Sequence, residues 1–111
     1  MEQFFLPVLS HFQNENFWTA SDRRMRYLVT PKDSETLEAQ VWEGPWGHAF
    51  SQIEEITSFP LSEEGLAQLK DWCVRWSETI NARPPRSLEE TIAMRDAALQ
   101  AKASQSTDAE S

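Results

Sequence analysis

The chain of 111 residues lacks the features that mark secreted or membrane-embedded proteins. Its single cysteine, Cys73, excludes an intramolecular disulfide and favours a reducing compartment. No apolar run approaches the roughly 20 residues of a membrane span. The start, MEQFFLPVLSHF, has no basic region, and Pro7 and Ser10 interrupt its apolar run, which argues against a signal peptide. We therefore expect a cytoplasmic protein that does not bind a membrane.

Catalytic motifs are also missing. Three glycines leave little room for a phosphate-binding loop, and the sequence contains no H-E-x-x-H, C-x-x-C or G-x-S-x-G. His11 and His48 fall in different predicted elements, where surface or local hydrogen-bonding roles are commoner than catalytic ones. Glu54 and Glu55 are adjacent in a predicted strand, so they point to opposite faces. We expect no cofactor, no metal and no enzymatic activity; a ligand-sized pocket lined by His48 or Cys73 would contradict this.

The stretch from Asp33 to Glu64 contains no lysine or arginine, and the net charge of the whole chain is −8. The rest of the chain has ten acidic and ten basic residues, so this stretch carries the whole excess. Such a surface repels phosphate backbones, so we expect a protein partner with a basic surface and no direct nucleic-acid binding. A general role in solubility is the alternative. The stretch contains eight acids: Asp33, Glu35, Glu38, Glu43, Glu54, Glu55, Glu63 and Glu64.

The first half of the chain predicts a helix followed by a sheet. Residues 2–13 have apolar side chains at helical spacing, and Pro7 either starts or kinks this helix. Phe17 and Trp18 are then expected to anchor the chain on the core. Alternation of apolar and polar residues predicts three strands joined by short turns, which favours an antiparallel meander. These strands cover residues 24–30, 36–43 and 49–58, and the turn Gly44-Pro45-Trp46-Gly47 is expected to use glycine at positive φ.

The second half predicts two helices. Pro60 ends the sheet, and Ser62 caps a long amphipathic helix. A break at Pro84-Pro85 follows, and the S-x-x-E sequence from Ser87 to Glu90 fits a capping box that starts the last helix. The apolar stripe of the first of these helices consists of Leu66, Leu69, Cys73, Trp76 and Ile80, with Trp72 on its flank.

Together these elements predict a single α+β domain over residues 1–102. It would have an N-terminal helix, a three-stranded antiparallel β-meander and two C-terminal helices. Residues 103–111 change to Ser, Gln, Thr and Asp, which predicts a disordered tail.

Five tryptophans are many for a chain of this length. Trp42 shares a strand face with Glu38, and Trp46 lies at the tip of a turn. Exposed tryptophan is typical of binding hot spots. If a helix covers this face of the sheet, Trp42 is buried instead, and the sequence leaves both arrangements open. The predicted partner-binding residues are Glu38, Trp42, Glu43, Trp46, Glu54 and Glu55.

Three segments carry a resemblance to known proteins: VWEGPWGHAFSQIEE, FPLSEEGLAQLKDW and NARPPRSLEETI. Over residues 37–93 the chain resembles small uncharacterised proteins encoded on phage and conjugative elements of gut Firmicutes. Small accessory proteins of such elements include inhibitors of host defence such as anti-CRISPR proteins, some of which occupy basic nucleic-acid channels with acidic surfaces. This resemblance implies a context and assigns no residue a role.

Two functional hypotheses follow. The first is a small acidic protein-binding module, an anti-CRISPR-like inhibitor whose carboxylates stand in for phosphates in a basic groove of a nucleic-acid-handling defence protein. The second is a regulatory or structural dimerising subunit, antitoxin-like and without catalytic activity. In that case a second copy would complete the thin apolar stripe of the last helix, formed by Leu88, Ile92 and Leu99.

Overall fold

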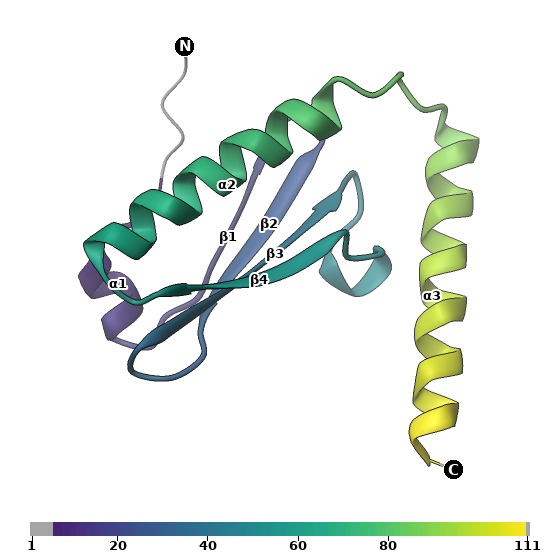
Figure 1. The fold of residues 1–111 in the computed structure, drawn as a ribbon. Helices are drawn as coiled ribbons and strands as arrows, with labels where there is room; N and C mark the ends of the chain where they lie inside the picture. Colours follow the sequence, from purple (N-terminus) through teal and green to yellow (C-terminus); the bar gives the residue numbers. More distant parts are fainter. Residues whose placement is uncertain (1–5, 111) are drawn as a thin grey trace.

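The computed structural model describes residues 6–110 and confirms the α+β class (Figure 1). Three α-helices, one short 3-10 helix and four strands follow one another in the described residues. Their order is α1 (Leu9–Gln13), β1 (Trp18–Asp22), β2 (Met25–Pro31), β3 (Thr36–Glu43), η1 (His48–Phe50), β4 (Glu55–Pro60), α2 (Glu63–Asn81) and α3 (Leu88–Glu110).

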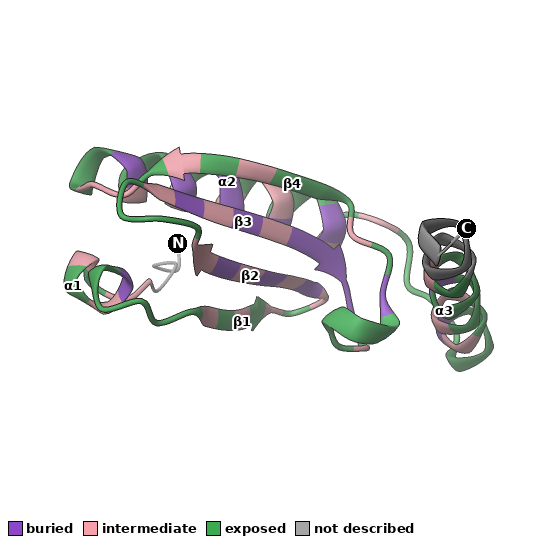
Figure 2. Ribbon diagram, turned by 90° about the horizontal axis from the view of Figure 1, so that it is seen from below, coloured by how far each residue is buried: buried purple, intermediate pink, exposed green. Residues whose placement is uncertain are grey.

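The strands form one antiparallel sheet in the order β1-β2-β3-β4. Helix α2 packs along one face of this sheet, and α3 stands beside it (Figure 1). Seen from below, α2 lies behind the strands and no α-helix crosses in front of them (Figure 2). Within residues 6–110, the sheet therefore has an inner face covered by α2 and an outer face that is open except where the β3–β4 loop covers Trp42.

The edge strand β1 corrects the predicted three-stranded meander. It pairs with β2 so that Trp18 lies opposite Val29. Arg23, in the two-residue connection, has a φ of 60°, as hairpin turns of this length require at their first central position. Of the two expected anchors, Trp18 packs on the core and Phe17 is exposed. The sequence WTASD does alternate between half-buried and exposed residues, but it is short and has one large apolar side chain, Trp18, so it was not recognised as a strand.

The predicted strand over residues 49–58 is wrong in its first half, where the chain forms η1 and a loop before β4. Ser51 explains the difference, because its hydroxyl donates to the carbonyls of Trp46 at 3.2 Å and Gly47 at 2.8 Å and holds the loop closed. The expected positive φ at glycine is also wrong, since no glycine has one among the described residues. Strand β4 ends at Pro60, as predicted.

The predicted N-terminal helix is shorter than expected. Helix α1 begins at Leu9, two residues after Pro7, and residues 2–5 of the prediction lie outside the described part of the chain. Phe12 is the buried residue of this short helix and joins the main core. The stiff proline thus precedes the helix, where its missing N–H costs nothing.

The core is a single layer between the inner face of the sheet and α2. Alternate residues of β2 and β3 point into it, and each large side chain buried there contributes roughly 1.5–3 kcal/mol. On α2, Trp72 is buried and Trp76 only half-buried, which reverses the predicted assignment of these two residues. The fully buried positions of β2, β3 and α2 are Met25, Tyr27, Val29, Leu37, Ala39, Val41, Leu69, Cys73 and Ile80.

Helix α2 starts with the predicted cap and a tight turn. The hydroxyl of Ser62 accepts a hydrogen bond from the backbone N–H of Gly65 at 3.0 Å. A Cβ at Gly65 would lie 1.8 Å from the carbonyl oxygen of Pro60. Glycine is thus required for the chain to pass from β4 into α2 within two residues.

Helix α3 begins with the predicted capping box. The N–H of Ser87 donates to Glu90 at 2.7 Å, and the N–H of Glu90 donates to the Ser87 hydroxyl at 3.1 Å. The helical backbone continues to Glu110, through the residues that composition predicts to be disordered. Because α3 stands outside the sheet–helix layer, the radius of gyration is 15.2 Å, against about 13 Å for a compact chain of this length.

Candidate functional site: a cleft beside the last helix

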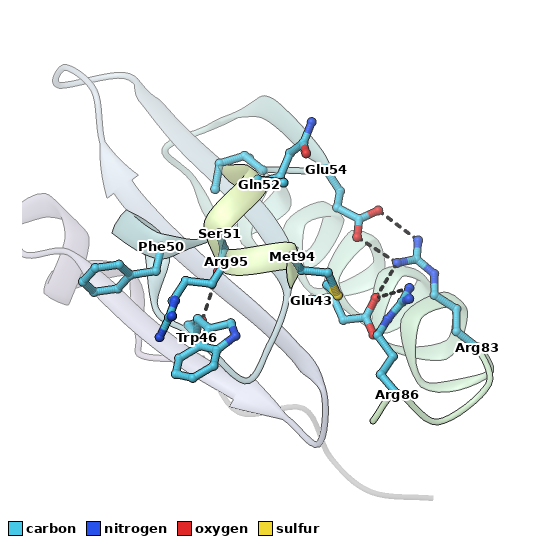
Figure 3. A pocket seen from close by; sticks show the side chains of 12 residues that line it. Glu43, Trp46, Phe50, Ser51, Gln52, Glu54, Arg83, Arg86, Met94 and Arg95 are labelled. Carbon is cyan, nitrogen blue, oxygen red and sulfur yellow. Dashed lines mark hydrogen bonds and ion pairs between the residues drawn. The ribbon is translucent and has the colours of Figure 1, made fainter. Parts of the chain in front are cut away.

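A cleft of about 450 Å³ opens between α3 and the segment that joins β3 to β4 (Figure 3). Its volume falls within the roughly 300–1,000 Å³ typical of small-molecule sites. Neither His48 nor Cys73 lines it. Its charged lining consists of Glu43, Glu54, Arg83, Arg86 and Arg95, and its apolar lining of Trp46, Phe50, Ile53, Met94 and Ala97.

At one end of the cleft, the buried carboxylate of Glu43 accepts hydrogen bonds from two arginines (Figure 3), and Nη1 of a third, Arg24, lies 3.7 Å from its Oε2. Arg86 donates from Nε to Oε2 at 2.8 Å and from Nη2 to Oε1 at 3.1 Å, and Arg83 donates to Oε1 at 2.9 Å. Burial raises the pKa of Glu43, but the hydrogen bonds from Arg86 and Arg83 outweigh it and hold that pKa below its ordinary value. Glu43 is therefore ionised at neutral pH.

The position of these two arginines is fixed by a third. The guanidinium of Arg24, in the β1–β2 turn, donates to the carbonyls of Ile80 at 3.1 Å, Arg83 at 2.5 Å and Pro84 at 3.0 Å. These carbonyls belong to the end of α2 and to the linker that follows. Arg24 thus satisfies carbonyl groups that a helix end leaves open and sets the linker against the sheet.

Glu54 forms the second ion pair of the cleft. Arg83 donates to both of its oxygens, at 2.8 and 2.9 Å, in the bidentate geometry that is strongest for this pair. The hydrogen bonds to Glu54 and then to Glu43 raise the pKa of Arg83. Two residues predicted to bind a partner, Glu43 and Glu54, are therefore neutralised by the chain itself.

At the other end of the cleft, Trp46 joins the loop to α3. Its indole N–H donates to the carbonyl of Thr91 at 2.8 Å, and the guanidinium of Arg95 lies 5.0 Å from the centre of its ring (Figure 3). Phe50 extends this apolar end, and Met94 also lines the cleft. Trp46 thus has a structural role and also lines the cleft.

The other predicted site residues lie away from the cleft. Trp42 is buried, and its indole donates to the carbonyl of Trp46 at 3.0 Å, which supports the arrangement in which this residue is covered. Trp42 is covered by the loop between β3 and β4 and not by an α-helix. Glu55 accepts bonds from the indoles of Trp72 at 2.8 Å and Trp76 at 2.7 Å and so ties β4 to α2. Glu38 lies on the outer face of the sheet, 3.7 Å from Lys32.

Acidic residues gather instead at the opposite end of the sheet. Thr36 of β3 pairs with Pro60 of β4, and the N–H of Leu61 donates to the carbonyl of Glu35 at 2.8 Å. This pairing brings the β2–β3 hairpin next to the first turn of α2. Segments 32–38 and 61–68 contain one basic residue, Lys32. We call their five acids the acidic end: Asp33, Glu35, Glu38, Glu63 and Glu64.

The arginines of the cleft were not identified as site residues from the sequence. Arg83 and Arg86 flank the proline pair, and the sequence does not decide whether they contact an acid of the chain or a partner. That pairing was not predicted, because it joins residues about 40 positions apart. The sequence did not indicate Met94 and Arg95 as site residues, because neither belongs to the thin apolar stripe predicted for the last helix.

His48 and Cys73 have structural surroundings. His48 contacts Gln40 through Nε2 at 2.7 Å, and burial, followed by the nearby charge of Lys102, lowers its pKa. Burial raises the pKa of the Cys73 thiol to about 12.

Among residues 6–110, no group of three or more His, Cys, Asp or Glu side chains is placed to hold a metal ion. No helix in the described part of the chain is long and apolar enough to cross a bilayer.

Comparisons with known proteins give no relative. No protein-family model matches the chain, and no curated protein and no solved structure is significantly similar to it.

Proposed function

We propose that this protein is a protein-binding module that docks its acidic end onto a basic surface of a partner. The observation that supports this proposal is the pairing of the β2–β3 hairpin with the start of α2, which joins five acids beside one lysine. Carboxylates on such a surface can occupy the Lys and Arg side chains of a phosphate-binding groove. An anti-CRISPR-like inhibitor of a nucleic-acid-handling defence protein is the function that fits best.

Charge complementarity of this kind mainly accelerates association and weakens with salt. Glu43, Glu54 and Glu55 accept hydrogen bonds from other side chains of the chain, so the proposed binding surface does not include them. Glu35, Glu63 and Glu64 are exposed and become the residues expected to contact a partner.

The test is co-precipitation from a bacterial lysate at low and moderate salt, with captured proteins identified by mass spectrometry. The variant Glu63→Lys/Glu64→Lys should lose a salt-sensitive nucleic-acid-binding partner. Glu78→Lys/Glu89→Lys, a matched reversal of two exposed helix positions elsewhere, should keep it. The purified partner should then lose DNA or RNA binding when the wild-type protein is added. Equal capture by both variants would refute the proposal.

A second candidate function is self-association through α3. Leu88 and Leu99 are 71% and 39% exposed on this helix, with the half-buried Ile92 between them on the same side. Sedimentation of the wild type should then show a concentration-dependent dimer that Leu99→Glu abolishes. A monomer over the whole concentration range would exclude this role.

A further inference from the structure

The cleft beside α3 has a local charge opposite to that of the protein. Three arginines and two glutamates line it, which leaves one positive charge in surplus, whereas the whole chain has a net charge of −8. Since an acidic protein repels anions over most of its surface, this cleft is a place where an anion would be attracted.

The surplus charge belongs to Arg95. Glu43 is saturated by Arg86 and Arg83, and Glu54 is bound on both oxygens by Arg83. Apart from the ring of Trp46, Arg95 contacts its neighbour Asp96, at 3.3 Å, in a pair in which the aspartate is largely exposed. Exposed pairs of this kind contribute little, about 0–1 kcal/mol, so the guanidinium can turn to a ligand at small cost.

The walls around Arg95 are suited to a flat or branched apolar group. The ring of Trp46 lies beside the guanidinium, and Phe50 and Met94 also line the cleft. Phe50 is 47% exposed although it is a large aromatic residue. Ala97, a small residue on α3, also lines the cleft.

We propose that this cleft binds a carboxylate that carries an aromatic or branched apolar group. The guanidinium fork of Arg95 would hold the carboxylate, and Trp46 and Phe50 would contact the apolar group. One surplus positive charge matches a monoanion, while the neighbouring Glu43 and Glu54 disfavour a phosphate dianion. The ligand is either a free organic acid or the C-terminal residue of a peptide.

This inference does not rest on the proposed function. The cleft lies at the Glu43 end of β3, whereas the acidic end lies at the Thr36 end of the same strand. Reversal of Glu63 and Glu64 should therefore leave ligand binding in the cleft unchanged, so the two proposals fail separately.

The experiment is a titration of the full chain followed by NMR of the Trp46 indole N–H. The probes are indole-3-propionate and the peptide Ala-Ala-Phe, each compared with its neutral carboxamide, and inorganic phosphate. We expect saturable shifts with a Kd of about 1 mM or tighter for the acids, and at least tenfold weaker binding of the amides. Binding of indole-3-propionate alone identifies a free acid as the ligand, and binding of Ala-Ala-Phe alone identifies a peptide end.

Three variants make the result specific. Ala97→Leu should fill the cleft and abolish binding, whereas Ala93→Leu, the same change at an exposed position of α3 outside the lining, should not. Arg95→Gln should reduce affinity for the acids about tenfold and leave that of the amides unchanged. If Ala97→Leu fails to fold, Phe50→Ala serves as the second test. Absence of any shift, equal binding of acid and amide, equal binding of phosphate, or unchanged binding by Ala97→Leu would overturn the proposal.

Discussion

Arg86 and Glu43 meet in two hydrogen bonds, of 2.8 and 3.1 Å, across the boundary between the α2–α3 linker and the end of β3. The side chain of Glu43 is 2% exposed, while that of Arg86 is 33% exposed. The pair therefore joins a buried acid to a base that still contacts water.

Replacing Glu43 by Gln should destabilise the fold, because Arg83 and Arg86 would face a neutral amide. Loss of one partner of a buried ion pair costs about 3–5 kcal/mol, and the exposure of the arginines reduces our expectation to about 2 kcal/mol. Urea denaturation measures this change. Glu38→Gln removes a carboxylate whose partner Lys32 is 3.7 Å away and mostly exposed, and it should cost under about 0.5 kcal/mol. Equal losses in both variants would contradict the role assigned to Glu43.

Gly65 and Gly47 should respond in opposite ways to alanine. At Gly65 the new Cβ would lie 1.8 Å from the backbone oxygen of Pro60, so the variant should lose about 3 kcal/mol or fail to fold. At Gly47 no atom lies within 4 Å and φ is −76°, so alanine should be neutral or stabilise by up to about 1 kcal/mol. Thermal unfolding compares the two, and a stable Gly65→Ala variant would show that the β4–α2 turn can relax.

The stability of the protein should fall in mildly acidic solution because of His48. Burial, followed by Lys102, lowers its folded-state pKa below the ordinary value of 6.5. The unfolded chain then binds the proton more readily, so the contribution of His48 is complete above pH 6.5 and is lost as pH falls through the folded pKa. The free energy of unfolding, measured against pH, should show this decline in the wild type and a flatter curve in His48→Gln. Identical curves would refute it.

Trp46→Phe should loosen α3 without unfolding the sheet. It removes the 2.8 Å bond to the carbonyl of Thr91 and weakens the contact with Arg95. A neutral hydrogen bond contributes about 0.5–1.5 kcal/mol, so amide exchange in α3 should accelerate about tenfold while exchange in β2 stays unchanged. Trp76→Phe, which loses a bond to Glu55 on the far side of the core, should leave α3 exchange as it is.

Local signals predicted much of this fold. The caps at Ser62 and Ser87 were confirmed because each depends on a hydroxyl and a backbone N–H three residues away. The strand over residues 49–58 was wrong because Ser51 bonds to the preceding loop, which alternation of side chains cannot reveal. Strand β1 was missed because its stability comes from pairing with β2 and not from its own composition.

The candidate site was harder to predict than the fold. Charge counting identified Glu43 and Glu54 as notable, but their arginines come from the linker about 40 and 30 positions away. The sequence also left open whether Trp42 is covered, and the covering group is the adjacent loop, through Trp46. The first case depends on a long-range contact and the second on the conformation of a loop, and a single sequence contains no direct record of either.

The open outer face of the sheet has a thermodynamic consequence. The molecule measures 43 × 40 × 16 Å, so its hydrophobic layer is only one helix and one sheet deep. Ile56, on the outer face, is 55% exposed, and Leu28 is only half-buried there. A protein that covered this face would create a second apolar layer, and its binding would show a large negative heat-capacity change in calorimetry. Docking at the acidic end alone would show a small one, so the temperature dependence of the binding enthalpy would reveal which surface a partner uses.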